Sequence, residues 1–222
     1  MAVFKPKYIT FDCYGTLINF DMAGAAASQF ADRISPQQMA AFTEDFSRYR
    51  MDEVLGAFKL YPQVVGDALY RTCNKWRVEC TEQDCAAIMA ACATWGPHPD
   101  VPAGLATVAK AFPLVLLTNS TDALIKHHVP RLGAPIYMTI TAEEVGAYKP
   151  QMKGFEVMLS KLDCGPEEIL HVSSSLRYDL MTAHDLGIKH KVFVNRGHGP
   201  GLDYYGYTEV KDIGGLPAVV GL

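Results

Sequence analysis

Short apolar strands alternate with helical segments along the second half of the chain, and this alternation constrains the fold more than any other feature. Parallel strands need crossover connections, which helices usually supply. The pattern therefore predicts an α/β fold, with a doubly wound, Rossmann-like core whose parallel sheet is covered by helices on both faces. Strands are predicted at 114–118, 137–141, 169–173 and 191–195, and helices at 122–131, 151–162 and 178–186.

One further strand lies far from the others in the sequence. Residues 8–12 (YITFD) are β-branched and aromatic and lead into a Gly-containing turn, which is typical of a buried strand that feeds a loop. From there to residue 97 the pattern is helical, and Thr81 with Asp84 marks one helix start as an N-cap pair. The sequence predicts a core of residues 1–18 and 98–222 and an inserted helical cap domain, residues 19–97.

Composition excludes several classes of function. Charged residues make up 20% of the 222 residues and the net charge is −4, so no basic field exists to hold a nucleic acid. No apolar run approaches the roughly 18 residues that span a bilayer, and the N-terminus lacks a secretory apolar core. Six cysteines occur without a C-x-x-C pair. We therefore expect a cytoplasmic protein with reduced thiols, no membrane partner and no nucleic acid partner.

Polar side chains gather where the predicted strands end. Asp12 closes the first strand, Thr118 and Asn119 end another, and serines occupy 173–175. In open parallel sheets, ligands bind outside the carboxyl ends of the strands. These residues are therefore the candidate site, although Thr118 and Asn119 could instead cap the following helix.

Four short segments in this order resemble the motifs of the haloacid dehalogenase superfamily. They are Asp12–Thr16 (DCYGT), 117–120 (LTNS), Lys149–Pro150, and 173–179 (SSSLRYD). The resemblance covers nearly the whole chain, including a helical cap after the first motif. It implies that Asp12 is a catalytic nucleophile.

Two positions favour carbon–halogen chemistry within that superfamily. Phosphatase members carry an acid two residues after the nucleophile, because an alkoxide leaving group must be protonated, whereas this chain has Tyr14. Where phosphatases have Gly-Asp-Ser to help hold Mg²⁺, this chain has Ser173–Ser175, and hydroxyls are poor ligands for a hard cation. The chain therefore resembles the type II L-2-haloacid dehalogenases, which implies neither a metal nor another cofactor.

The resemblance implies a role for each matching residue. Asp12 would attack C2 of a small halogenated carboxylic acid and form an aspartyl ester. Lys149 would keep Asp12 ionised, and Asp179 would activate the water that hydrolyses the ester. Carboxylates and water would be positioned by Thr16 and by Ser173 or Ser174. The substrate or halide would be bound by Cys13, Tyr14, Thr118, Asn119 and, from the cap, Arg50.

Several alternatives stay open at this stage. Arg48 competes with Arg50 for the halide, since residues two apart on a helix point in different directions. The family has a tyrosine where this chain has Phe155, and the fourth motif is one residue longer before Asp179. A phosphatase of the same superfamily and a non-catalytic protein that binds small carboxylates are the rival functions. The resemblance also implies a homodimer.

Overall fold

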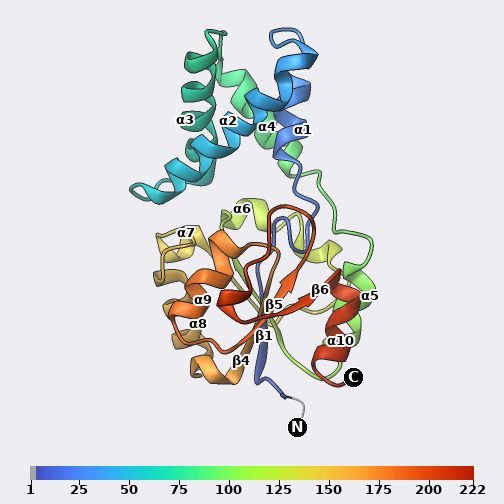
Figure 1. Ribbon diagram of the computed structural model, residues 1–222. Helices are drawn as coiled ribbons and strands as arrows, with labels where there is room; N and C mark the ends of the chain where they lie inside the picture. The colour runs from blue at the N-terminus through green and yellow to red at the C-terminus, as the bar shows by residue number, and fades with distance from the viewer. Residues whose placement is uncertain (1–3) are drawn as a thin grey trace. The chain divides into compact units, whose positions relative to one another are not determined.

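The computed structural model describes residues 4–222 and contains a six-stranded, wholly parallel sheet (Figure 1). The strand order is β3-β2-β1-β4-β5-β6. The strands are β1 (Tyr8–Phe11), β2 (Leu114–Thr118), β3 (Met138–Thr141), β4 (Ile169–Ser173), β5 (His190–Val194) and β6 (Thr208–Val210). The predicted α/β class and parallel sheet are confirmed. Strand β6 was not predicted, because its three residues are largely exposed and carry no apolar pattern.

The chain reverses its direction of winding beside β1. After β1 it adds β2 and β3 on one side, and then crosses over to add β4, β5 and β6 on the other. In the register of the sheet, Thr10 of β1 lies between Val115 of β2 and His171 of β4. The gap between the carboxyl ends of β1 and β4 is therefore the topological switch point, where open α/β sheets bind their ligands.

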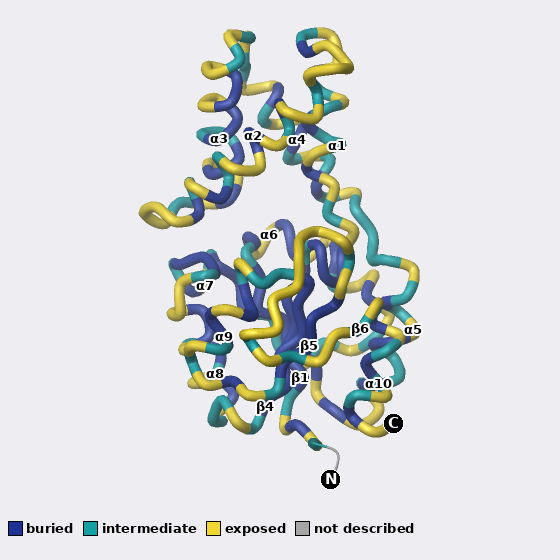
Figure 2. The backbone as a smooth tube through the Cα atoms, in the orientation of Figure 1, coloured by how far each residue is buried: buried dark blue, intermediate teal, exposed yellow. Residues whose placement is uncertain are grey.

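Helices cover both faces of the sheet, with α7, α8 and α9 on one side and α5 and α10 on the other (Figure 1). Strands β2 and β4 are buried along their whole length, and the central strands of the sheet are largely buried in Figure 2. The core helices are α5 (Val101–Val108), α6 (Asp122–Ile125), α7 (Ala142–Val145), α8 (Lys153–Leu162), α9 (Met181–Asp185) and α10 (Leu216–Val219). Short 3₁₀ turns cover Val129–Arg131, Pro166–Glu168, Asp203–Tyr205 and Ile213–Gly215.

Two predicted core helices differ from the structure. The helix predicted at 122–131 is split into α6 and a 3₁₀ turn, because Pro130 lacks the N–H that would continue the helix. The helix predicted at 178–186 is preceded by a wide π-helical turn over Leu176–Leu180. In this turn the Leu180 N–H donates to Ser175 O, five residues back, at 3.2 Å. The turn therefore accommodates one residue more than an α-helical turn would.

Residues 20–95 form one compact unit, and residues 4–19 and 96–222 form another. Aromatic side chains at Phe30, Phe42 and Phe46 are fully buried in the interior of the unit of residues 20–95. The predicted N-cap pair is present, since the Thr81 side chain accepts from the Asp84 N–H at 3.2 Å. The unit consists of α1 (Met22–Gln29), α2 (Pro36–Leu55), α3 (Tyr61–Trp76) and α4 (Glu82–Cys92).

All six cysteines are free thiols. Within residues 4–222, no helix is both long enough and apolar enough to cross a membrane.

Candidate active site

Asp12 follows β1 directly and lies at the switch point. Its backbone N–H donates to Val172 O at 3.0 Å, which extends the pairing with β4 by one residue. Its side chain is almost closed to solvent, at 10% exposure, yet both carboxylate oxygens have donors. Lys149 Nζ lies 2.8 Å from Oδ1, and Thr16 Oγ1 donates to Oδ2 at 2.6 Å. The side chain is therefore held in one orientation by two independent hydrogen bonds.

The loop after Asp12 folds back so that Thr16 can reach the carboxylate. Gly15 has φ +90°, a left-handed conformation that favours glycine, and this residue makes the reversal possible. The Leu17 N–H closes the turn by donating to Cys13 O at 2.8 Å. A D-x-x-G-T sequence thus places the threonine hydroxyl directly beneath the aspartate four residues earlier.

Lys149 is the centre of the charge arrangement. Its ammonium group donates to Asp12 Oδ1 at 2.8 Å, to Asp179 Oδ1 at 2.7 Å and to Leu117 O at 2.8 Å. An ammonium has three N–H donors, so all of them are used. The lysine backbone is fixed as well, because the Asn119 amide both accepts from Lys149 N and donates to Lys149 O, each at 2.8 Å.

The two carboxylates that share Lys149 have opposite pKa shifts. Burial raises the pKa of Asp12, and the nearby charge of Asp179 adds to this, while Lys149 and Thr16 act in the other direction. Burial would raise the pKa of Asp179 too, but Lys149 and the hydrogen bond from His171 outweigh it and hold that pKa below its usual range. Asp179 is therefore the more strongly stabilised anion of the pair.

Ser173, Ser174 and Ser175, whose roles the sequence left open, have three different functions in the loop after β4. Ser174 is hydrogen-bonded to the loop after Asp12, since its N–H donates to Thr16 Oγ1 at 2.8 Å and its hydroxyl lies 3.1 Å from the same atom. Ser173 Oγ accepts from Ser175 N at 3.0 Å and is buried. Ser175 Oγ accepts from Tyr178 N at 3.0 Å and caps the π-helical turn. Ser174 is thus the serine that reaches the Asp12 network.

The remaining core candidates lie around this centre in different environments. Cys13 is fully buried, and burial is the main cause that raises the pKa of its thiol, which disfavours the reactive thiolate. The Tyr14 hydroxyl lies 2.9 Å from His128 Nδ1 and accepts from Ser120 Oγ at 3.3 Å. Thr118 ends β2 with a buried hydroxyl that has no hydrogen-bond partner in the described part of the chain. Thr121, rather than Thr118 or Asn119, caps α6 by accepting from the Leu124 N–H.

Four residues that the sequence did not point to contribute to this centre. His171, on β4, contacts Asp179, and His128 contacts Tyr14. Thr10 supports His171 from β1. Arg196 donates to Thr16 O at 3.0 Å and thereby supports the loop after Asp12. The signal for His171 was available, because a polar residue inside a buried strand needs hydrogen-bond partners.

Arg48 and Arg50 have different surroundings in the helical unit. The Arg48 side chain is 66% exposed and is paired with Glu44 at 2.6 Å. The Arg50 guanidinium instead lies over the rings of Phe20 and Phe46, at 5.3 and 5.2 Å from their centroids. Its Nε is buried and has no hydrogen-bond partner among the described residues. Of the two arginines, Arg50 is therefore the one whose buried Nε–H has no acceptor among the described residues.

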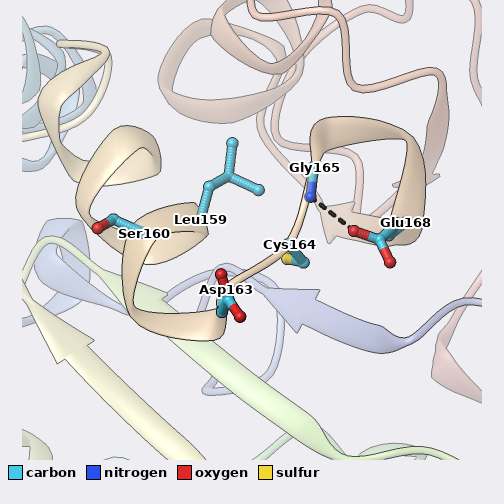
Figure 3. A pocket seen from close by; sticks show the side chains of 6 residues that line it. All are labelled: Leu159, Ser160, Asp163, Cys164, Gly165 and Glu168. Atoms are coloured by element: carbon cyan, nitrogen blue, oxygen red, sulfur yellow. Dashed lines mark hydrogen bonds between the residues drawn. The ribbon is translucent and has the colours of Figure 1, made fainter.

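A surface pocket at the other edge of the sheet is not part of this centre. It lies between the end of α8 and the start of β4, where the Gly165 N–H donates to Glu168 Oε2 at 2.8 Å (Figure 3). Because Glu168 precedes the first residue of β4, the pocket is at the amino end of a strand whose carboxyl end carries the site. Burial raises the pKa of the Cys164 thiol in this pocket, which makes it a weak nucleophile.

A model described as haloacid dehalogenase-like hydrolase matches residues 6–187, which is most of the chain and includes Asp12, Lys149 and Asp179. The chain belongs to the haloacid dehalogenase-like hydrolases. The superfamily resemblance read from the four motifs is thereby confirmed.

Individual relatives of this hydrolase are dehalogenases. The (S)-2-haloacid dehalogenase 2 of Pseudomonas sp. (strain CBS-3) is 24% identical over 192 residues, covering 85% of this chain and 83% of the relative. The haloacetate dehalogenase H-2 of Moraxella sp. (strain B) is 23% identical over 222 residues, covering 98% of each. A solved L-2-haloacid dehalogenase from Xanthobacter autotrophicus, with chloropropionic acid covalently bound, has a TM-score of 0.79 and 21% identity. It covers 98% of this hydrolase and 99% of its own chain, and shows that the fold is shared.

Proposed function

We propose that this hydrolase converts short 2-haloalkanoic acids and water into 2-hydroxy acids and halide through an ester of Asp12. The observation that carries the proposal is the Asp12 carboxylate itself. It is buried, and each of its oxygens accepts one hydrogen bond, from Lys149 at 2.8 Å and from Thr16 at 2.6 Å. Such a carboxylate is oriented and partly stripped of water, which suits nucleophilic attack on carbon.

In the first half of the reaction, an Asp12 oxygen bonds to C2 of the substrate as the carbon–halogen bond breaks. The bonding pair leaves with the halide, so the products are an Asp12 ester and a free halide ion. No proton is required, because chloride and bromide are anions of strong acids. The residue in the phosphatase acid position, Tyr14, is a phenol bound to His128 rather than a carboxylic acid, which agrees with this chemistry.

The names of the relatives support the same substrate class. One is described as acting on (S)-2-haloacids and another on haloacetate, and both align over most of this hydrolase. The structure from Xanthobacter autotrophicus is described with chloropropionic acid covalently bound. A covalent substrate in a protein of the same fold agrees with an ester intermediate on Asp12.

The donor set around Asp12 fits poorly with a bound Mg²⁺. The Lys149 ammonium lies between the Asp12 and Asp179 carboxylates, at 2.8 and 2.7 Å, where a second cation would be repelled. The loop after β4 offers hydroxyls instead of a further carboxylate. Within the described residues, no three His, Cys, Asp or Glu side chains are arranged to hold an ion. We propose that Lys149 supplies the positive charge that the reaction needs.

The helical unit, residues 20–95, is proposed to act as the cap. Arg50 is the candidate halide ligand within it, because its buried Nε has no partner among the described residues and aromatic rings surround it. A guanidinium against aromatic faces is weakly hydrated and suits a large, soft anion.

The test is halide release from chloroacetate, fluoroacetate and each enantiomer of 2-chloropropionate, measured in EDTA. Asp12→Asn is the matched control, since it keeps the shape and removes the nucleophilic charge. Release that persists in EDTA and is abolished in Asp12→Asn supports the proposal and ranks the substrates. Substrate binding without release would indicate a non-catalytic carboxylate-binding protein. Mg²⁺-dependent hydrolysis of a phosphate ester without halide release would establish the phosphatase alternative.

A further inference from the structure

His171 occupies the middle of β4 and is completely buried. Both of its ring nitrogens have partners, with Nδ1 2.8 Å from Thr10 Oγ1 and Nε2 3.1 Å from Asp179 Oδ1. Thr10 is its register partner on β1, so the sheet itself fixes the distance between them. The ring of Phe155 packs edge-on against the imidazole, with centroids 5.0 Å apart. The imidazole is therefore held rigidly between the sheet and Asp179.

The two carboxylate oxygens of Asp179 differ in their hydrogen bonds. Oδ1 accepts from both Lys149 Nζ, at 2.7 Å, and His171 Nε2, at 3.1 Å. Oδ2 is buried and has no hydrogen-bond partner within residues 4–222. Buried carboxylate oxygens are normally bonded, so an exception needs an explanation. Two donors on one oxygen fix the rotation of the carboxylate and leave the whole accepting capacity of the other oxygen for a ligand.

We propose that His171 is a positioning residue for the hydrolytic half of the reaction, where its Nε2–H, together with Lys149, holds Asp179 so that Oδ2 receives the proton of the attacking water. This inference rests on the proposed function and deepens it. His171 does not contact the ester and acts through Asp179.

The hydrolytic step can be written in full. The water oxygen bonds to the carboxyl carbon of the Asp12 ester, and the bond from that carbon to the substrate oxygen breaks. One water proton passes to Asp179 Oδ2 and then to the departing alkoxide, which leaves as the 2-hydroxy acid. The second water proton leaves the regenerated Asp12 carboxyl group for solvent. Both carboxylates are therefore restored, and the halide has already departed.

A histidine suits this position because it has a hydrogen-bonding atom on each side of its ring. Its Nε2–H donates to Asp179 Oδ1, and its Nδ1 lies 2.8 Å from the Thr10 hydroxyl. The charged groups that face Asp179 are then Lys149 directly and Asp12 through Lys149. A second cation would stabilise the Asp179 anion further and weaken it as a base.

The experiment separates the two half-reactions in three variants of the full chain. His171→Gln keeps a donor near the Nε2 position, His171→Asn moves the donor toward Nδ1 and Thr10, and His171→Phe removes both. Rapid-quench assays with 2-chloropropionate measure the halide burst, and intact-mass spectrometry measures the Asp12 ester. The pH dependence of ester hydrolysis is recorded for each variant.

We expect His171→Phe and His171→Asn to give a full halide burst but to hydrolyse the ester roughly 10- to 100-fold more slowly, so that the ester accumulates. The acid limb of the hydrolysis profile should move to higher pH, because the pKa of Asp179 rises when a donor is lost. His171→Gln should restore much of the rate. If His171→Phe does not fold, the Gln and Asn variants carry the comparison.

Ester hydrolysis at the wild-type rate in His171→Asn and His171→Phe would overturn the inference. The inference would also be overturned if the variants slowed both half-reactions equally and left the acid limb of the ester-hydrolysis profile unchanged, since a merely structural role would give that result. No halide burst from the wild-type protein would overturn the proposed function and, with it, this inference. A wild-type burst combined with unaffected variants would overturn the inference alone.

Discussion

Lys149 Nζ and Asp12 Oδ1 form an ion pair at 2.8 Å that is almost closed to solvent, with the two residues 2% and 7% exposed. The same ammonium also binds Asp179. One buried cation thus compensates two buried carboxylates. Removing it would leave both negative charges without a counter-charge, at a site where water cannot easily replace it.

Lys149→Met should therefore affect both stability and activity. We expect the free energy of unfolding to fall by about 3–5 kcal/mol, because breaking a buried pair leaves an uncompensated charge. Halide release should fall below detection, since the pKa of Asp12 rises further when Lys149 is lost. Urea unfolding and halide assays check this. Lys153→Met, at an exposed position in α8, is the control and should change neither quantity. A stable, active Lys149→Met variant would contradict the central place of this pair.

Thr16 links Asp12 to the loop after β4, so its hydroxyl should be more important than its methyl group. Thr16→Val removes the donor to Asp12 Oδ2 and the acceptor for the Ser174 N–H. We expect a loss of about 1–3 kcal/mol in the free energy of unfolding, because two buried polar groups lose their partner. The acid limb of halide release should shift to higher pH. Thr16→Ser keeps the hydroxyl, and equal behaviour of the two variants would argue against this role.

Asp84 stabilises the helical unit in a pH-dependent way. It accepts from Arg33 at 2.7 and 3.0 Å and from Gln29 at 2.7 Å, and these bonds, led by those from Arg33, hold the pKa of its carboxyl well below its usual range. A depressed folded-state pKa contributes stability above the unfolded pKa of about 3.9, and that stability is lost as the pH falls toward the folded value.

Asp84→Asn should therefore lower the free energy of unfolding by about 1.5–3 kcal/mol at pH 7. Below about pH 4 the free energies of unfolding of the variant and the wild type should approach each other. Denaturant unfolding across this pH range gives the measurement. Asp32→Asn is the control, since the Asp32 side chain is 78% exposed. A difference that is constant down to pH 2 would show that the charge of Asp84 is not what stabilises the unit.

Arg50 and Arg48 provide a matched pair for testing the proposed halide ligand. Arg50→Ala should lower kcat/KM for halide release by about 10²- to 10³-fold, the effect of removing a donor aimed at developing negative charge. For Arg48→Ala, kcat/KM should remain within about twofold of the wild-type value, because an exposed helical ion pair such as that of Arg48 with Glu44 contributes little to stability. Steady-state halide assays on both variants decide the matter. Equal losses in the two variants would remove Arg50 from the site.

The strands and the order of the motifs could be predicted from the sequence, because apolar periodicity and turn residues are local signals. The sequence also indicated that Lys149 and Asp12 lie close together, and their side chains are 2.8 Å apart; that Lys149 keeps Asp12 ionised stays a prediction. The role of His171 was not predicted. A strand sequence shows which residues alternate, but the position of His171 opposite Thr10 depends on the register of two strands whose paired residues are 161 positions apart.

Asn119 illustrates a different limit. Binding of the substrate or halide by this residue stays a prediction, and its side-chain amide is hydrogen-bonded to the backbone of Lys149 in both directions. Sequence indicates that an amide follows a strand, but it does not indicate whether the amide faces a ligand or another loop. The division of roles among Ser173, Ser174 and Ser175 depended on the loop conformation for the same reason.

The π-helical turn at Leu176–Leu180 has a consequence for comparing this protein with its relatives. An extra residue in an ordinary α-helix would rotate the side chains on one side of it by about 100° relative to those on the other. The widened turn absorbs that rotation locally, so Asp179 still meets Lys149 while α9 keeps its packing face. The length of the fourth motif and the direction of its carboxylate are therefore uncoupled. For any relative whose turn at this place is α-helical, superposition of the carboxylates, and not a residue count from the serines, would find the counterpart of Asp179.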